Sequence, residues 1–149
     1  MWNVIFEIDL GDMVYDFTKF TIPQMCQLLK KWITWSHDNL HKDSKVFVNF
    51  RDLPDVMPEH SDRVFEVVDF LAKLPPKVRP FGLTFEESRG KSLPEECATW
   101  AKYIRKVMDD NEWKAHLLVH VHEKFGYCDV TALEVLNLFI LYPCRFFIS

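Results

Sequence analysis

The chain has 149 residues, of which 48% are hydrophobic and 27% charged, and its formal net charge is −4. These values are typical of one globular domain that buries about two-thirds of its unfolded surface, and they argue against disorder or a fibre. The acidic balance, without a run of lysine and arginine that could follow phosphates, argues against nucleic acid as a partner.

Cysteine usage and the chain ends predict an intracellular, cytoplasmic protein. No signal peptide is expected, because the N-terminus opens directly into a strand-like segment. The apolar segment Leu138–Ile148 is too short to span a bilayer and contains Pro143 and Arg145, so we expect no membrane span. The cysteines form no C-x-x-C pair and are expected to be reduced thiols that act as small buried hydrophobes: Cys26, Cys97, Cys128 and Cys144.

The first predicted unit is a strand followed by a helix. Trp2–Leu10 alternates apolar and polar residues, with Glu7 and Asp9 on the polar side near its C-terminal end. A helix is expected from Thr21, which is a suitable N-cap and is followed by a proline, to about Ser36.

The second unit repeats this order. Lys45–Asp52 alternates as a strand that places Asn49 and Arg51 on its polar side. After a loop with two prolines, Ser61 is expected to cap a helix that ends at Leu74, before a proline pair.

The third unit has the same pattern. Phe81–Glu87 is the predicted strand, with Thr84 and Glu86 on its polar side. Ser92, three residues before a glutamate, resembles a capping box and predicts a helix through Met108.

The fourth unit contains the most informative motif, Leu117–Tyr127 (LLVHVHEKFGY), followed by a helix with Asp129 as its N-cap. Side chains two apart on a strand point the same way, so His120 and His122 share a face. Imidazole is the commonest metal ligand, and this pair would be half of a metal site. The alternative is that both are ordinary polar residues at a strand end.

Four strand–helix units at a spacing of about 35 residues predict an α/β fold with parallel strands. Each strand has one apolar side and places polar groups toward its C-terminal end, where they would meet at one mouth. A doubly wound sheet would be apolar on both faces, so half of a TIM (β/α)8 barrel fits better, although four strands cannot close a barrel. We expect one domain over residues 1–149, with an atypical apolar tail at 137–149.

Two segments, GLTFEESRGKSLPEE and LLVHVHEKFGYCDVTALEVL, resemble the late strands of a family of metal-dependent TIM barrels. This pyruvate carboxyltransferase-like family includes hydroxymethylglutaryl-CoA lyase, isopropylmalate synthase and homocitrate synthase. Its H-x-H near the end of strand seven supplies two metal ligands, and His120 and His122 match it, with Glu123 and Gly126 at the expected offsets. The resemblance implies that the chain corresponds to strands four to seven.

The chain also departs from the family. The family's aspartate and arginine at the end of strand one and its asparagine ligand near strand eight have no counterpart. Arg51 and Asp52 repeat the arginine–aspartate pair, but belong to a different strand by order. The segment 137–149 resembles nothing in the family, and a truncated or alternatively spliced product would explain it.

The resemblance implies a divalent metal (Mg²⁺, Mn²⁺ or Zn²⁺) acting as a Lewis acid on a 2-oxo acid or acyl-CoA, in a lyase or synthase that breaks or forms a carbon–carbon bond. Arg51 is the expected clamp for a substrate carboxylate, although an ion pair with Asp9 or Glu86 is an alternative. The expected roles are metal ligation by His120 and His122, catalysis by Arg51 and Glu86, substrate binding by Asp9 and Asn49, and support of the imidazoles by Glu87 and Glu123.

As a lyase or synthase the domain is incomplete, and it would be inactive until another chain supplies the missing ligands. It could instead be a non-catalytic interaction module that forms a homo-oligomer through its open sheet edges. A flavodoxin-like binding domain is a weaker alternative, because the sequence has no Gly-rich phosphate loop.

Overall fold

A computed structural model describes the backbone of residues 3–122, 125–138 and 144–148, with side chains as far as residue 135. Strands and helices alternate along the whole described chain, as the sequence predicts. The elements are β1 (Val4–Ile8), α1 (Ile22–Asn39), β2 (Val46–Phe50), α2 (Leu53–Ala72), the short 3-10 helix η1 (Pro76–Val78), β3 (Gly82–Glu87), α3 (Pro94–Asp110), β4 (His116–Val121), α4 (Cys128–Leu138) and β5 (Cys144–Ile148).

The strands form one sheet in the order β1-β2-β3-β4-β5, and every neighbouring pair is parallel. The predicted α/β fold is therefore confirmed. Strand order equal to chain order, without the reversal of a doubly wound sheet, is consistent with half of a (β/α)8 barrel. The tail differs from the prediction, because the backbone of Cys144–Ile148 adds a fifth parallel strand beside β4.

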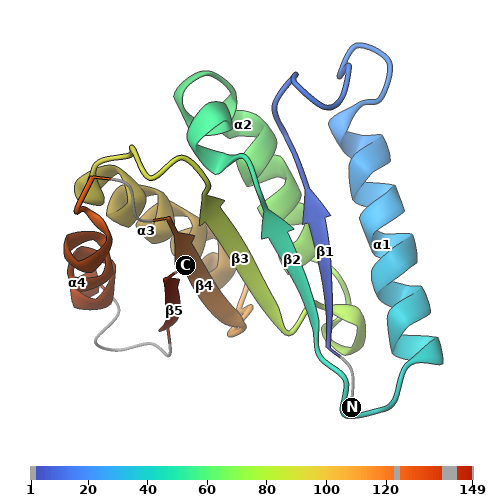
Figure 1. Ribbon diagram of the computed structural model, residues 1–149. Coiled ribbons are helices and arrows are strands. Elements are labelled where there is room, and N and C mark those ends of the chain that lie inside the picture. Colours follow the sequence, from blue (N-terminus) through green and yellow to red (C-terminus); the bar gives the residue numbers. More distant parts are fainter. Residues whose placement is uncertain (1–2, 123–124, 139–143, 149) are drawn as a thin grey trace.

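Alternate residues of each strand build two different faces. Val48, Phe50 and Phe85 point toward the helices and are fully buried. Figure 1 shows α2 and α3 behind the sheet, while the face turned to the viewer is not covered by them. On this open face Ile5 is 58% exposed. Parallel register sets Glu86 beside His120 there. The open face is the one that carries polar side chains, as the strand patterns predict.

Helix starts agree with the sequence only in part. Thr21 caps α1 as expected, and its N–H donates to Gln24 Oε1 at 2.8 Å. In contrast, α2 begins at Leu53 rather than at Ser61, and is kinked at His60, two residues after a proline that removes a helical N–H.

The predicted caps of the last two helices do not coincide with the observed helix starts. Leu93 precedes α3 and its N–H donates to Glu96 Oε2, so the capping box does not begin at Ser92. The helix α4 begins at Cys128, which places Asp129 in its first turn.

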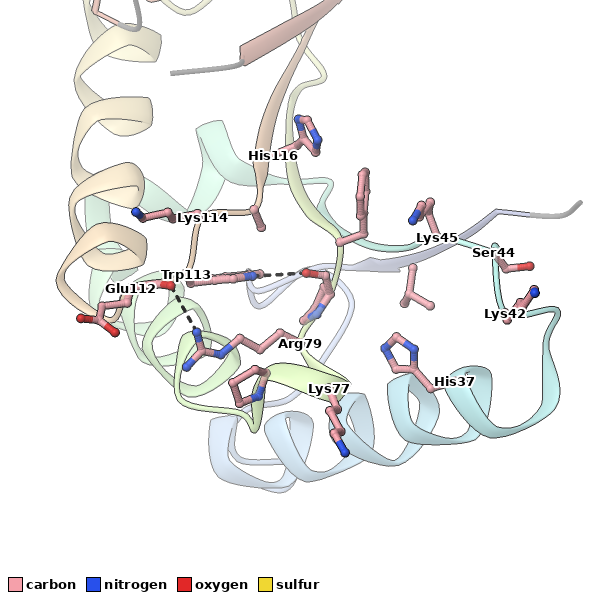
Figure 2. Close-up of a pocket in the computed structure, with 15 residues that line it drawn as sticks. His37, Lys42, Ser44, Lys45, Lys77, Arg79, Glu112, Trp113, Lys114 and His116 are labelled. Atoms are coloured by element: carbon pink, nitrogen blue, oxygen red, sulfur yellow. Dashed lines mark hydrogen bonds between the residues drawn. The ribbon is translucent and has the colours of Figure 1, made fainter. Parts of the chain in front are cut away.

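The two ends of the sheet present different chemistry. The C-terminal ends of the strands carry carboxylates and imidazoles, whereas the N-terminal ends border a cavity of about 440 Å³ rimmed by basic residues (Figure 2). Within the described residues no helix is long and apolar enough to cross a membrane.

Candidate metal centre

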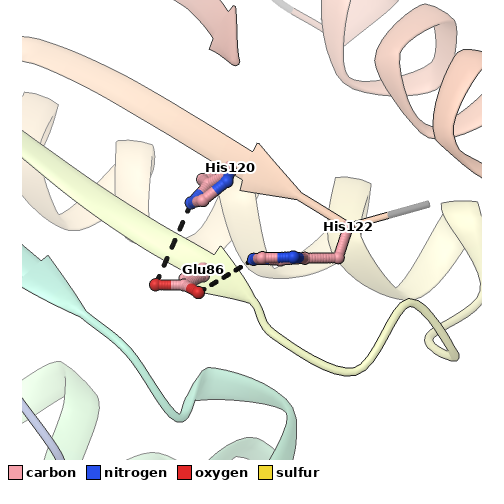
Figure 3. A group of neighbouring side chains, drawn as sticks. All are labelled: Glu86, His120 and His122. Atoms are coloured by element: carbon pink, nitrogen blue, oxygen red, sulfur yellow. Dashed lines mark hydrogen bonds and ion pairs between the residues drawn. The ribbon is translucent and has the colours of Figure 1, made fainter. Parts of the chain in front are cut away.

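Three side chains with metal-binding atoms converge at the C-terminal end of the sheet. Glu86 extends from β3, His120 from β4, and His122 follows β4 directly. One ligand atom of each lies within 4.8 Å of the others, and Figure 3 shows the carboxylate facing both rings. Strand alternation places all three on the open face, because they occupy positions of the same parity in register.

The side chains of this cluster lie close to one another. His122 Nε2 lies 2.9 Å from Glu86 Oε1, His120 Nδ1 lies 3.9 Å from Glu86 Oε2, and the ring centroids are 4.5 Å apart. The side chain of Glu86 is 14% exposed and those of the histidines 27% and 36%, so solvent reaches the cluster. Two imidazoles and one carboxylate are a ligand set for a divalent transition metal, and three protein ligands leave coordination positions for a substrate.

Asn49 supports the carboxylate from the neighbouring strand β2. Its side chain is 5% exposed, and its Nδ2 donates to Glu86 Oε2 at 3.3 Å. Its Oδ1 is buried without a hydrogen-bond partner in the described part of the chain. Asn49 was expected to face the substrate, but its side-chain amide contacts the candidate ligand Glu86. This hydrogen bond restricts the rotation of the Glu86 carboxylate.

Arg51 and Asp9 lie beyond the ends of β2 and β1 and form a two-bond ion pair. Arg51 Nε donates to Asp9 Oδ1 at 3.1 Å and Nη2 to Oδ2 at 2.7 Å. This hydrogen bonding and the charge of Asp9 raise the pKa of Arg51, with smaller additions from Glu7 and Glu86. The structure thus contains the ion pair that the sequence left as the alternative to a substrate clamp.

Glu87 does not join the cluster, contrary to the expected support of the imidazoles. It lies on the helix-covered face, where it is 3% exposed, and accepts hydrogen bonds from Gly90 N–H at 2.5 Å and Ser92 Oγ at 3.1 Å. Strand alternation turns it away from Glu86, and its carboxylate holds the loop that follows β3. The other expected supporting residue, Glu123, lies outside the described residues.

Asp52 has a structural role that sequence reasoning missed. Its carboxylate accepts N–H donors from Leu10 at 2.9 Å and from Gly11 at 2.6 Å, and so joins the end of β1 to the start of α2. Burial raises the pKa of Asp52 even though these hydrogen bonds act to lower it. A Cβ on Gly11 would lie 2.9 Å from Asp52 Oδ2, which explains a glycine there. The sequence signal for this role was an aspartate between a strand and the helix that follows it.

The three cysteines whose side chains are described, Cys26, Cys97 and Cys128, are buried. Burial raises the pKa of both Cys26 and Cys97 to about 12, so these thiols remain protonated at neutral pH. The side chain of Cys144 lies outside the described residues.

Comparison with models of known protein families gave no match, and comparison with curated proteins gave none either. The function of the chain is therefore inferred from the chemistry of the site itself.

Proposed function

We propose that Glu86, His120 and His122 bind a divalent metal ion whose open positions take the oxygen atoms of a small carboxylate substrate. The observation that carries this proposal is the approach of three ligand atoms to within 4.8 Å at the C-terminal ends of parallel strands. Enzymes with parallel α/β sheets place their chemistry at that end. Two imidazole ligands favour Zn²⁺ or Mn²⁺ over Mg²⁺, which prefers oxygen.

The substrate class follows from the groups beside the cluster. Arg51 is 48% exposed and bonds Asp9 through Nε and Nη2, so its remaining N–H groups can receive a substrate carboxylate. Asn49 holds Glu86 in place. A bound metal would act as a Lewis acid on a carbonyl oxygen and favour an enolate. These features support a 2-oxo acid or acyl-CoA substrate and a carbon–carbon lyase or synthase activity, as the resemblance implies.

Calorimetric titration of the metal-free protein with ZnCl₂ and MnCl₂ tests the site. Wild type should bind one ion. Glu86→Gln and His122→Ala should weaken binding by more than the roughly 10- to 100-fold that loss of an outer-shell partner costs. His116→Ala is the matched control, because His116 begins the same strand on the same face but is not part of the cluster, and its affinity should equal that of wild type.

A separate measurement tests the chemistry. In D₂O, metal-loaded wild type should exchange the methyl protons of pyruvate, as followed by NMR, because enolate formation makes them labile. The double variant His120→Ala/His122→Ala should not. Absence of metal binding in wild type would contradict the site, whereas metal binding without exchange would contradict only the proposed reaction.

The exposed edge of the sheet favours a second candidate, a module that associates with another copy of itself. Beside β1 an apolar groove of about 320 Å³ is lined by Val4, Phe6, Trp32, Trp35 and Ser36. Trp35 is 59% exposed, and large exposed apolar side chains at a sheet edge are typical of an interface. Sedimentation velocity should find a dimer that Trp35→Glu converts to a monomer, and a monomeric wild type would contradict this candidate.

A further inference from the structure

The cavity at the N-terminal end of the sheet lies opposite the candidate metal centre and is built from four separate segments. These are the end of α1, the loop before β2, the segment around η1, and the loop between α3 and β4 (Figure 2). Its volume of about 440 Å³ is within the range of small-molecule sites, about 300 to 1,000 Å³.

Positive charge gathers around this cavity although the chain as a whole has a net charge of −4. Of the residues that the structure describes, Glu112 is the only carboxylate in the lining, and none of the lining lysines forms an ion pair. The permanently cationic residues in the lining are Lys42, Lys45, Lys77, Arg79 and Lys114. Five like charges from three segments raise the local concentration of anions.

Arg79 is positioned by neutral groups that leave its charge intact. Its Nε donates to Leu74 O at 2.7 Å, and its Nη1 lies 3.4 Å from the carbonyl oxygens of Asn111 and Glu112. In the loop that carries Lys114, Glu112 has a φ of 55°, a left-handed conformation that residues other than glycine rarely adopt. The guanidinium of Arg79 is therefore positioned before any ligand arrives.

Two polar atoms of the lining are buried without a hydrogen-bond partner in the part of the chain that the structure describes. They are Ser44 Oγ and His116 Nδ1. Each can donate to an anion, the imidazole in a suitable tautomer. The ring of Phe81 lies between these segments, with Lys45 Nζ 4.5 Å and the His116 ring 4.8 Å from its centroid. Both atoms are covered in the structure, so a side-chain rotation must expose either of them before a ligand can pair with it.

We propose that this cavity binds a small molecule with two or more phosphate groups. Five cations exceed what a single monoanionic group can neutralise, and lysine and arginine are the residues that bind phosphate oxygens. A cavity of about 440 Å³ in an acidic chain favours a small ligand over a nucleic acid strand, which needs an extended basic groove. The inference does not depend on the metal centre, which occupies the other end of the sheet.

Calorimetric titration with pyrophosphate tests this proposal, and the host is His120→Ala/His122→Ala so that metal chelation contributes nothing. Lys77→Glu/Lys114→Glu should weaken binding at least about tenfold for each charge-assisted hydrogen bond to phosphate that the substitutions remove. The matched control is Lys30→Glu/Lys102→Glu, which changes net charge equally on exposed helix positions away from the cavity, and should stay within about twofold of the host.

NMR locates the site and separates alternative ligands. Pyrophosphate should shift the backbone amide signals of residues 76–81 and 112–116, and ADP should do the same, whereas inorganic phosphate should bind more weakly. The proposal is overturned if pyrophosphate does not bind, if both charge-reversed pairs weaken binding equally, or if a single-stranded RNA binds more tightly than pyrophosphate and shifts signals outside these segments.

Discussion

Glu86 and Glu87 are consecutive residues at the end of β3, and they serve the two faces of the sheet differently. Glu86 faces the open side and contacts His122. Glu87 faces the helices, is 3% exposed, and holds the next loop through Gly90 and Ser92. A glutamate is thus a candidate metal ligand on one face of the sheet and a structural anchor on the other.

This difference extends to the whole sheet. The helix-covered face consists of large apolar side chains that are fully buried, such as Phe50 and Phe85. The open face carries Asn49, Glu86 and the histidines, and its apolar side chain Ile5 is 58% exposed. Apolar burial is the main favourable term in folding, so stability should depend on the first face and ligand binding on the second.

The largest expected effect tests the covered face. Phe85→Ala should lower the free energy of unfolding by about 3–5 kcal/mol, because Phe85 is fully buried and its loss leaves a cavity. Ile5→Ala on the open face should change it by less than about 0.5 kcal/mol. Urea denaturation measures both, and equal losses would show that the faces do not differ in this way.

The two glutamates allow the sharpest version of the comparison. Glu87→Ala should cost about 1–3 kcal/mol of stability, because it leaves the buried N–H of Gly90 without its acceptor, and metal affinity should be unchanged. Glu86→Ala should abolish metal binding and change stability by no more than about 1 kcal/mol. Denaturation and calorimetry on the same two variants would contradict this assignment if the effects were exchanged.

A smaller effect is expected from Asp52, which joins β1 to α2. Burial raises the pKa of Asp52, so folding favours its protonated form. Its contribution to stability is present below the ordinary aspartate pKa of about 3.9 and is lost as the pH rises through the raised value. Asp52→Asn should remove this pH dependence. Denaturation between pH 3 and pH 7 is the measurement, and parallel curves for wild type and variant would contradict it.

Strand alternation was sufficient to predict which residues of the site lie together. Glu86, His120 and His122 share parity on adjacent strands, and parallel pairing converts that parity into contact. The same rule separates Glu87 from the site, whereas the resemblance to a family motif predicts that it supports the imidazoles. Asn49 was expected to face the substrate, whereas its nearest polar partner is Glu86.

Other features depended on contacts that no local pattern contains. The sequence left open whether Arg51 would clamp a substrate or pair with an acid, because the answer required the relative reach of two strand ends. The start of α2 was misplaced, since the kink at His60 joins two helical segments across a proline that predicts a break. Nothing in the sequence placed Lys45, Arg79 and Lys114 around one cavity.

The sequence by itself determined the alternating strands and helices, the two-sided strands and the shared face of the two histidines, because side-chain direction in a strand is a local property. Only the tertiary structure decided that Cys144–Ile148 adds a fifth strand, that Asp9 pairs with Arg51, and that separate loops meet around a basic cavity. These outcomes depend on how distant segments pack at the edges and ends of the sheet, where residues far apart in the chain become neighbours.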